Sequence, residues 1–180
     1  MEVIAQLIGL GAMGFNILSY QQKTRGKVIA FQLFGGFLFC INFFLLGAIA
    51  GSLLNAVAVV RAIVFLNKEK LRADHPAWLA GFTLVYLLCY WMTFGVFGKE
   101  VTWANLLIEF LPVVGMVATT ISFRLTDARS IRRYGLISSP AWLIYNVASF
   151  SIGAIVCEVL SLGSIILGML RLDRKTPEKN

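Results

Sequence analysis

The chain consists of long apolar runs separated by short basic segments. Seven such runs fall at about residues 3–20, 28–47, 49–66, 78–97, 104–123, 134–151 and 153–170. Runs of roughly 18 to 20 apolar residues match a hydrocarbon core about 30 Å thick, because a helix rises about 1.5 Å per residue. Only 14% of the residues are charged, whereas soluble domains have about a quarter. The pattern therefore predicts an all-α polytopic membrane protein with seven transmembrane helices.

The lysines and arginines indicate how these helices are oriented. Of the sixteen cations, all but Arg61 and Lys99 lie in the first, third and fifth loops or in the C-terminal tail. Basic loops face the cytoplasm, so we expect the N-terminus outside and the C-terminus inside. These loops also account for the net charge of +7, and nucleic acid is not an expected partner.

The chain also contains a weak internal repeat. At an offset of 104 residues Asn42 matches Asn146, and one residue of slippage then places Asn55 opposite Glu158. The basic loops repeat with the same order, which favours two three-helix units in the same orientation. We therefore predict four parts: a first three-helix repeat at 1–67, a linker with an inverter helix at 68–100, a second repeat at 101–172, and a cytoplasmic tail at 173–180.

Several segments resemble a known family. "GFNILSYQQKTRGKVIAFQLFGGFLFCINFFLLGAIAGSLLNAVAVVRAIVF", "IEFLPVVGMVATTISFR" and "AWLIYNVASFSIGAIVCE" are similar to the YgjV-type family of bacterial inner-membrane proteins, over nearly the whole chain. The resemblance implies a location in the bacterial inner membrane and brings no assigned role. The predicted 3+1+3 layout is more distantly similar to SWEET and PQ-loop transporters and to PnuC-type transporters. Where PQ-loop proteins carry Pro-Gln, this chain has Tyr20-Gln21.

Two acids lie inside predicted spans. Glu158 and Glu109 fall in the outer half of the bilayer in the predicted topology, where a carboxylate costs on the order of 3 kcal/mol on insertion scales. An amide would join helices at lower cost, so we interpret both glutamates as functional. Arg61 lies nearest the cytoplasmic end of its span and either snorkels to the interface or neutralises an acid.

Neutral polar and aromatic residues fall at comparable depth. Asn42, Asn55 and Asn146 either tie helices together by hydrogen bonds or line a cavity with the two glutamates. Trp142 and Tyr145 precede Asn146 and are candidates for stacking on a ring or a cation. We predict one solute site formed by these residues: Asn42, Asn55, Glu109, Trp142, Tyr145, Asn146 and Glu158.

The sequence favours transport over catalysis. The single histidine, His75, lies in a loop, the three cysteines have no metal-ligand spacing, and no nucleotide-binding motif occurs. We therefore expect no enzyme activity, no metal and no cofactor. The predicted function is a facilitator or proton-coupled carrier for a small polar, potentially cationic, organic solute. The alternative is a membrane accessory or sensor protein that transports nothing. The expected partners are the solute and the lipid bilayer, and homo-oligomer formation stays open.

Overall fold

The computed structural model describes residues 2–45, 49–148 and 152–173. This described part of the chain is helical and contains no strand. The elements are α1 (Glu2–Ser19), α2 (Arg25–Leu45), α3 (Ile49–Leu66), α4 (Lys68–Leu71), α5 (Pro76–Gly95), α6 (Trp103–Arg124), α7 (Ala128–Ala148), α8 (Ile152–Gly168) and the π-helical segment η1 (Met169–Asp173).

The helix starts follow from local capping chemistry. The His75 side chain accepts a hydrogen bond from the Ala77 amide at the start of α5, where Pro76 occupies a position that needs no N–H donor. Thr102 caps α6 in the same way. The Asp127 carboxylate accepts from the Ser130 amide at the start of α7. His75 is therefore an exposed capping residue in this fold.

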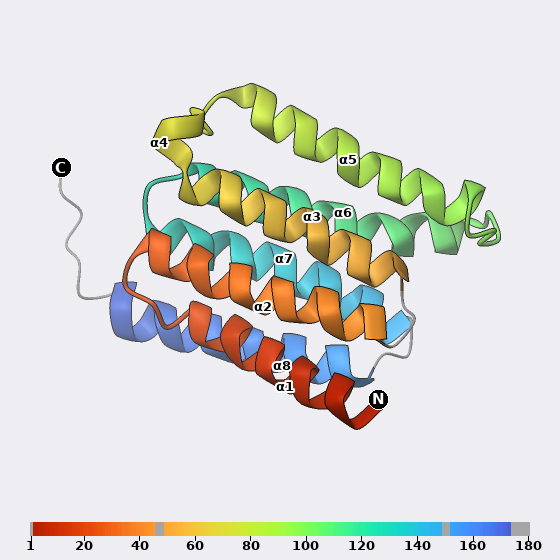
Figure 1. Cartoon of the computed structure of the whole chain (residues 1–180), viewed down its shortest axis with the longest axis horizontal. Coiled ribbons are helices and arrows are strands. Elements are labelled where there is room, and N and C mark those ends of the chain that lie inside the picture. The colour runs from red at the N-terminus through yellow and green to blue at the C-terminus, as the bar shows by residue number, and fades with distance from the viewer. Residues whose placement is uncertain (1, 46–48, 149–151, 174–180) are drawn as a thin grey trace.

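The seven long helices lie side by side and roughly parallel or antiparallel (Figure 1). In the first half, α1 packs on α2 and α2 on α3; in the second half, α6 packs on α7 and α7 on α8. Between the halves, α1 contacts α8, α2 contacts α7 and α3 contacts α6. The two halves therefore form two layers of three helices, and α5 packs on α6 beside them.

Three helical segments among the described residues are long and apolar enough to cross a membrane: Pro76–Gly95, Trp103–Arg124 and Gly153–Asp173. Two shorter apolar helices lie at Ile4–Ser19 and Ser52–Leu66. Large apolar side chains such as Leu84, Trp91 and Leu107 are exposed on the outside of the bundle. An apolar exterior of this kind is suited to lipid rather than water.

A buried aromatic cluster lies toward the end of the bundle where α3 and α6 finish. Phe65 and Phe123 are fully buried there, with ring centroids 6.0 Å apart in an edge-to-face arrangement. Phe82 and Tyr86 of α5 stack on each other beside them. This aromatic cluster joins α3, α5 and α6.

Each predicted apolar run overlaps with one long helix. The bounds of α3 coincide with the predicted run at 49–66, whereas α7 begins six residues before its predicted run, at Ala128 instead of residue 134. The reason is that the basic residues at the start of α7 extend the helix beyond its apolar part. The helices α4 and η1 are too short for the apolar pattern to reveal them. The predicted runs at 28–47 and 134–151 end on residues 46–47 and 149–151, which lie outside the described residues, as do residues 174–180 of the predicted tail.

Candidate functional site

Asn42 joins two helices of the first half. Its Nδ2 donates a 2.7 Å hydrogen bond to the backbone oxygen of Ala5 in α1, and the Asn42 side chain is buried. A Cβ added at Gly9 would lie 3.0 Å from the same Nδ2. The close approach of α1 and α2 at this point thus depends on a glycine and on a satisfied amide.

The remaining amides lie in helices of different halves. Asn55 is partly buried in α3, and Asn146 is buried near the end of α7. The backbone oxygen of Asn55 approaches the position that a Cβ at Gly36 would occupy, at 4.0 Å. This places Asn55 at the packed surface between α2 and α3.

Glu109, about two turns into α6, forms an ion pair. Its carboxylate accepts from Lys99 Nζ, which comes from the segment between α5 and α6. Glu109 is buried and Lys99 is partly exposed. The pair neutralises this carboxylate and ties the connecting segment to α6.

Trp142 and Tyr145 contact each other on α7. Their ring centroids lie 5.9 Å apart in an edge-to-face arrangement. Trp142 also packs against Gly115 of α6, where an added Cβ would lie 2.8 Å from the indole Nε1. In this conformation Trp142 therefore fills the space between α6 and α7.

Glu158 has partners that the sequence did not indicate. The buried Ser139 hydroxyl on α7 lies near both the Glu158 carboxylate and the Tyr20 hydroxyl. Tyr20 follows the last residue of α1 and is buried. Its ring passes Gly135, where an added Cβ would lie 3.3 Å from Tyr20 Cε1. Three helices thus contribute to the surroundings of one carboxylate.

Arg61 is a buried cation in α3, with 6% of its surface exposed. Its Nη1 donates to the Tyr86 hydroxyl at 3.2 Å and to the Met116 backbone oxygen at 3.3 Å. The guanidinium carbon lies 5.2 Å from the centre of the Phe123 ring. Its Nε is buried and has no hydrogen-bond partner among the described residues. Arg61 thus does not snorkel out of the bundle.

Arg61 and Glu158 share a neighbour, Tyr20. The Tyr20 hydroxyl is within electrostatic range of both the Glu158 carboxylate and the Arg61 guanidinium. The ion pairs found in the described part of the chain are Lys99–Glu109 and Arg132–Asp173, so neither central charge is in an ion pair there. We call Tyr20, Arg61, Ser139 and Glu158 the central polar cluster.

The structure therefore regroups the predicted residues. Trp142 contacts Tyr145, Asn42 contacts α1 and Glu109 contacts Lys99, but Glu158 belongs to the central polar cluster. Helix α7 lies between α6 and α8, which places it between Glu109 and Glu158. The prediction of one cavity shared by all seven residues stays a prediction. Sequence reasoning missed Tyr20 and Ser139, because a tyrosine at a helix end and a serine within a span are commonplace.

Ligands for a metal ion are not gathered in the described part of the chain. No group of three or more His, Cys, Asp or Glu side chains there is placed to hold an ion. Cys40, Cys89 and Cys157 are free thiols; Cys157 is buried, and the other two are partly exposed. The chemistry offered by the central polar cluster is instead hydrogen bonding and charge complementarity.

Comparison with protein families agrees with this membrane architecture. The model of the family Imp-YgjV, described as "Bacterial inner membrane protein", matches residues 3–176. The match covers nearly the whole chain, so the chain belongs to this family. No curated protein and no solved structure gives a significant match to the chain.

Proposed function

As a member of this family of bacterial inner membrane proteins, the chain resides in a membrane, and we propose that it transports a small polar solute across that membrane. The proposed site is the central polar cluster. The observation that carries the proposal is the pair of opposite charges, Arg61 and Glu158, which are held near one tyrosine hydroxyl without forming an ion pair.

Energetics support a functional role for these charges. A buried cation or carboxylate without an ionic partner is costly inside a membrane protein, and such residues commonly mark solute or proton pathways. A solute that presents a positive group or donors to Glu158 and an acceptor to Arg61 would satisfy both. The cluster therefore favours a small solute with donors at one end and acceptors at the other.

We propose the full 3+1+3 architecture for this transporter, with seven spans, an external N-terminus and a cytoplasmic C-terminus. Two packing contacts support the repeat at the offset of 104. A Cβ at Gly11 would meet Leu38, and a Cβ at Gly115 would meet Trp142, the residue that matches Leu38 in the second half. The contact of α1 with α8 likewise matches that of α6 with α3, as expected for parallel repeats.

The proposed mechanism is alternating access, either as a facilitator or with proton coupling through Glu158. At the end where α6 begins, the Lys99–Glu109 pair would have to separate for a solute to pass along α6. A single cavity that joins Glu109 to Glu158 would require α7 to move, because α7 lies between them. The proposal includes no catalytic step.

The test is transport by purified protein in proteoliposomes. The substrates are a panel of zwitterionic and cationic metabolites, and the readout is either capacitively detected current or tracer uptake. Glu158→Gln should reduce binding or transport by roughly ten- to hundredfold, because it removes a charged hydrogen-bonding group. A proton-coupled carrier would also lose its pH dependence. The matched control is Glu69→Gln, since Glu69 is an exposed acid on α4. Transport by Glu158→Gln that equals that of the unsubstituted protein across pH would disprove the assignment.

The second candidate is an accessory or sensor protein that transports nothing. Its support is the large share of polar groups that only join helices, such as Ser164 Oγ, which donates to the Ile17 backbone oxygen at 2.6 Å. This reading predicts that the central polar cluster is never reached by water. Cysteine substituted for Ser139 would then resist a membrane-permeant, water-dependent thiol reagent in every condition, whereas a transporter would expose it in at least one state.

A further inference from the structure

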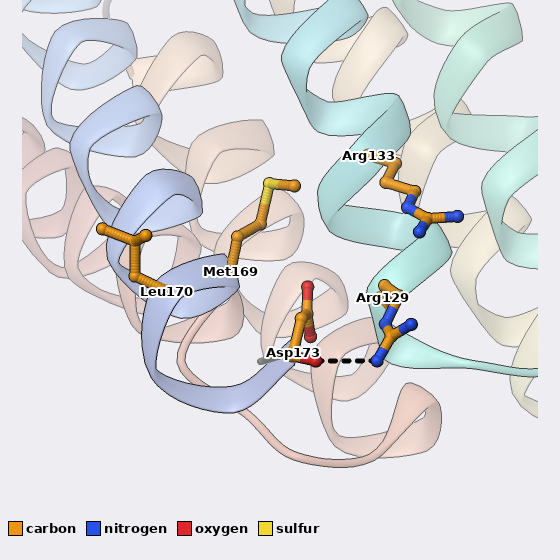
Figure 2. Close-up of a pocket in the computed structure, with 5 residues that line it drawn as sticks. All are labelled: Arg129, Arg133, Met169, Leu170 and Asp173. Atoms are coloured by element: carbon orange, nitrogen blue, oxygen red, sulfur yellow. Dashed lines mark hydrogen bonds between the residues drawn. The ribbon is translucent and has the colours of Figure 1, made fainter. Parts of the chain in front are cut away.

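A pocket lies at the end of the molecule where the arginines gather. It has a volume of about 270 Å³ and is lined by Arg129, Arg133, Met169, Leu170 and Asp173. Figure 2 shows the two arginines on α7 facing the η1 segment across this pocket. The pocket is at one end of the helices, and its lining contains none of the residues of the central polar cluster.

The charge of this pocket is positive. Arg129 and Arg133 are four residues apart on α7 and so share a helix face. The Asp173 carboxylate is already engaged by Arg132, which donates from Nε at 3.1 Å and also from Nη2. Arg129 donates to the Asp173 backbone oxygen at 2.7 Å, not to its carboxylate. Three arginines thus face one carboxylate.

Arg133 is the exposed cation of the group. It takes part in no hydrogen bond or ion pair within the described residues. An arginine at such a position can offer two parallel N–H donors to a phosphate. Arg133 is therefore the group in this pocket that is most available to an incoming anion.

The apolar surroundings distinguish this pocket from a site for a free anion. Met169 and Leu170 form part of its wall. Ile137, one turn from Arg133 on α7, and Ile166, one turn from Leu170, are both about half exposed. The pocket therefore continues onto an apolar surface that runs away from the charged end along α7 and α8.

We propose that this pocket binds the phosphate of an anionic phospholipid, whose acyl chains lie on the exposed apolar surface of α7 and α8. Basic pockets between membrane helices at the charged side recognise such headgroups. A free phosphate would satisfy the arginines but would leave the apolar surface unused. The combination of charge and apolar surface thus points to a lipid.

The experiment is native mass spectrometry of the full-length protein in detergent, titrated with phosphatidylglycerol, phosphatidylcholine or inorganic phosphate. We expect phosphatidylglycerol to form the first adduct at the lowest concentration, and millimolar phosphate not to displace it. Arg133→Gln should weaken this adduct by roughly fivefold, the effect of one basic residue near an anionic headgroup. The matched control is Arg171→Gln, because Arg171 is an exposed arginine of η1 that does not line the pocket.

Two further variants sharpen the test. Leu170→Gln changes the apolar wall and should weaken binding of the lipid without changing any charge. Thermal stability of each variant without added lipid reports whether it still folds. The proposal is wrong if Arg133→Gln leaves the apparent affinity unchanged, if Arg171→Gln lowers it equally, if phosphatidylcholine binds as tightly, or if phosphate alone competes.

Discussion

The two halves of the molecule share one packing plan but differ in where they carry charge. In both halves a glycine of the first helix packs against a large side chain of the second helix. Gly11 packs against Leu38, and Gly115 packs against Trp142. In the first half the Asn42 side-chain amide, an uncharged group, donates to the Ala5 backbone oxygen near the end of the bundle where α1 begins. In the second half Glu109 of α6, at the position that matches Ala5 in the repeat, is paired with Lys99.

The difference also extends to the contacts between the halves. The contact of α3 with α6 contains a bond from the charged Arg61 to the Met116 backbone oxygen, whereas the matching hydrogen bond between α1 and α8 is made by the neutral Ser164, whose Oγ donates to the Ile17 backbone oxygen at 2.6 Å. Backbone packing thus sets the common shape, and the polar side chains make the halves unequal. An asymmetric solute is bound best by such unequal surfaces.

The largest expected effect on stability comes from substituting Arg132, near the start of α7. The comparison is with Arg25, at the start of α2. Arg132 is 2% exposed and holds Asp173 together with the Tyr20 and Gln22 backbone oxygens. Arg132→Met should lower the free energy of unfolding by about 3 kcal/mol or more, because it leaves a poorly exposed carboxylate unpaired.

Arg25 is the matched comparison. It is only half-buried and donates to the backbone oxygens of Phe65 and Phe123. Arg25→Met should cost about 1–3 kcal/mol, the penalty for unsatisfied acceptors. Denaturation by a graded detergent series measures both. Adding Asp173→Asn to Arg132→Met should recover part of the loss, and equal losses for the two arginines would contradict this account.

An intermediate effect is expected from the glycines. Gly115→Ala should destabilise by about 1–3 kcal/mol, because its Cβ meets Trp142 at 2.8 Å. Gly11→Ala should be close to neutral, because its Cβ lies at an ordinary 3.7 Å from Leu38. The double variant Gly115→Ala with Trp142→Leu copies the pair of the first half and should recover stability. Thermal unfolding of the four proteins measures these differences, and a fully stable Gly115→Ala would refute the contact.

The smallest expected effect concerns Asn42. Asn42→Ala should cost about 0.6 kcal/mol, the average for a hydrogen bond between membrane helices, and should leave transport unchanged. The control is Asn67→Ala, because the Asn67 amide donates to Ile63 at an exposed site. A transport defect in Asn42→Ala without a loss of stability would instead place Asn42 in the solute path.

Much of the helical content could be predicted because apolar runs determine it locally. The α3 run was predicted at its observed bounds, whereas the start of α7 was not, since Arg129 and its neighbours are polar and yet helical. The ends of helices depend on capping residues such as Asp127, which act over three or four residues. A hydropathy profile is averaged over at least that distance, so it does not locate the ends of helices.

The central polar cluster could not be predicted in full. Glu158 was recognised because a carboxylate is costly in lipid, but its partners come from α1 and α7, which are far away in the sequence. Arg61 was expected either to snorkel or to neutralise an acid, and it does neither directly. Its contacts with Tyr86 and Met116 depend on which helices are neighbours, and no pattern within α3 specifies those neighbours.

The arginine contacts at the basic end also have a mechanical consequence. Arg25 of the first half holds Phe123 of the second, and Arg132 of the second half holds Tyr20 of the first. Because each half is hydrogen-bonded to the other at this end, we expect it to act as the pivot of a rotation, with the largest displacements at the opposite ends of the helices. A rotation of roughly 10° about the pivot would move the far ends of 18-residue helices by about 5 Å. Spin-label distances should therefore change more at the far end than at the basic end, and equal changes at both ends would exclude a pivot.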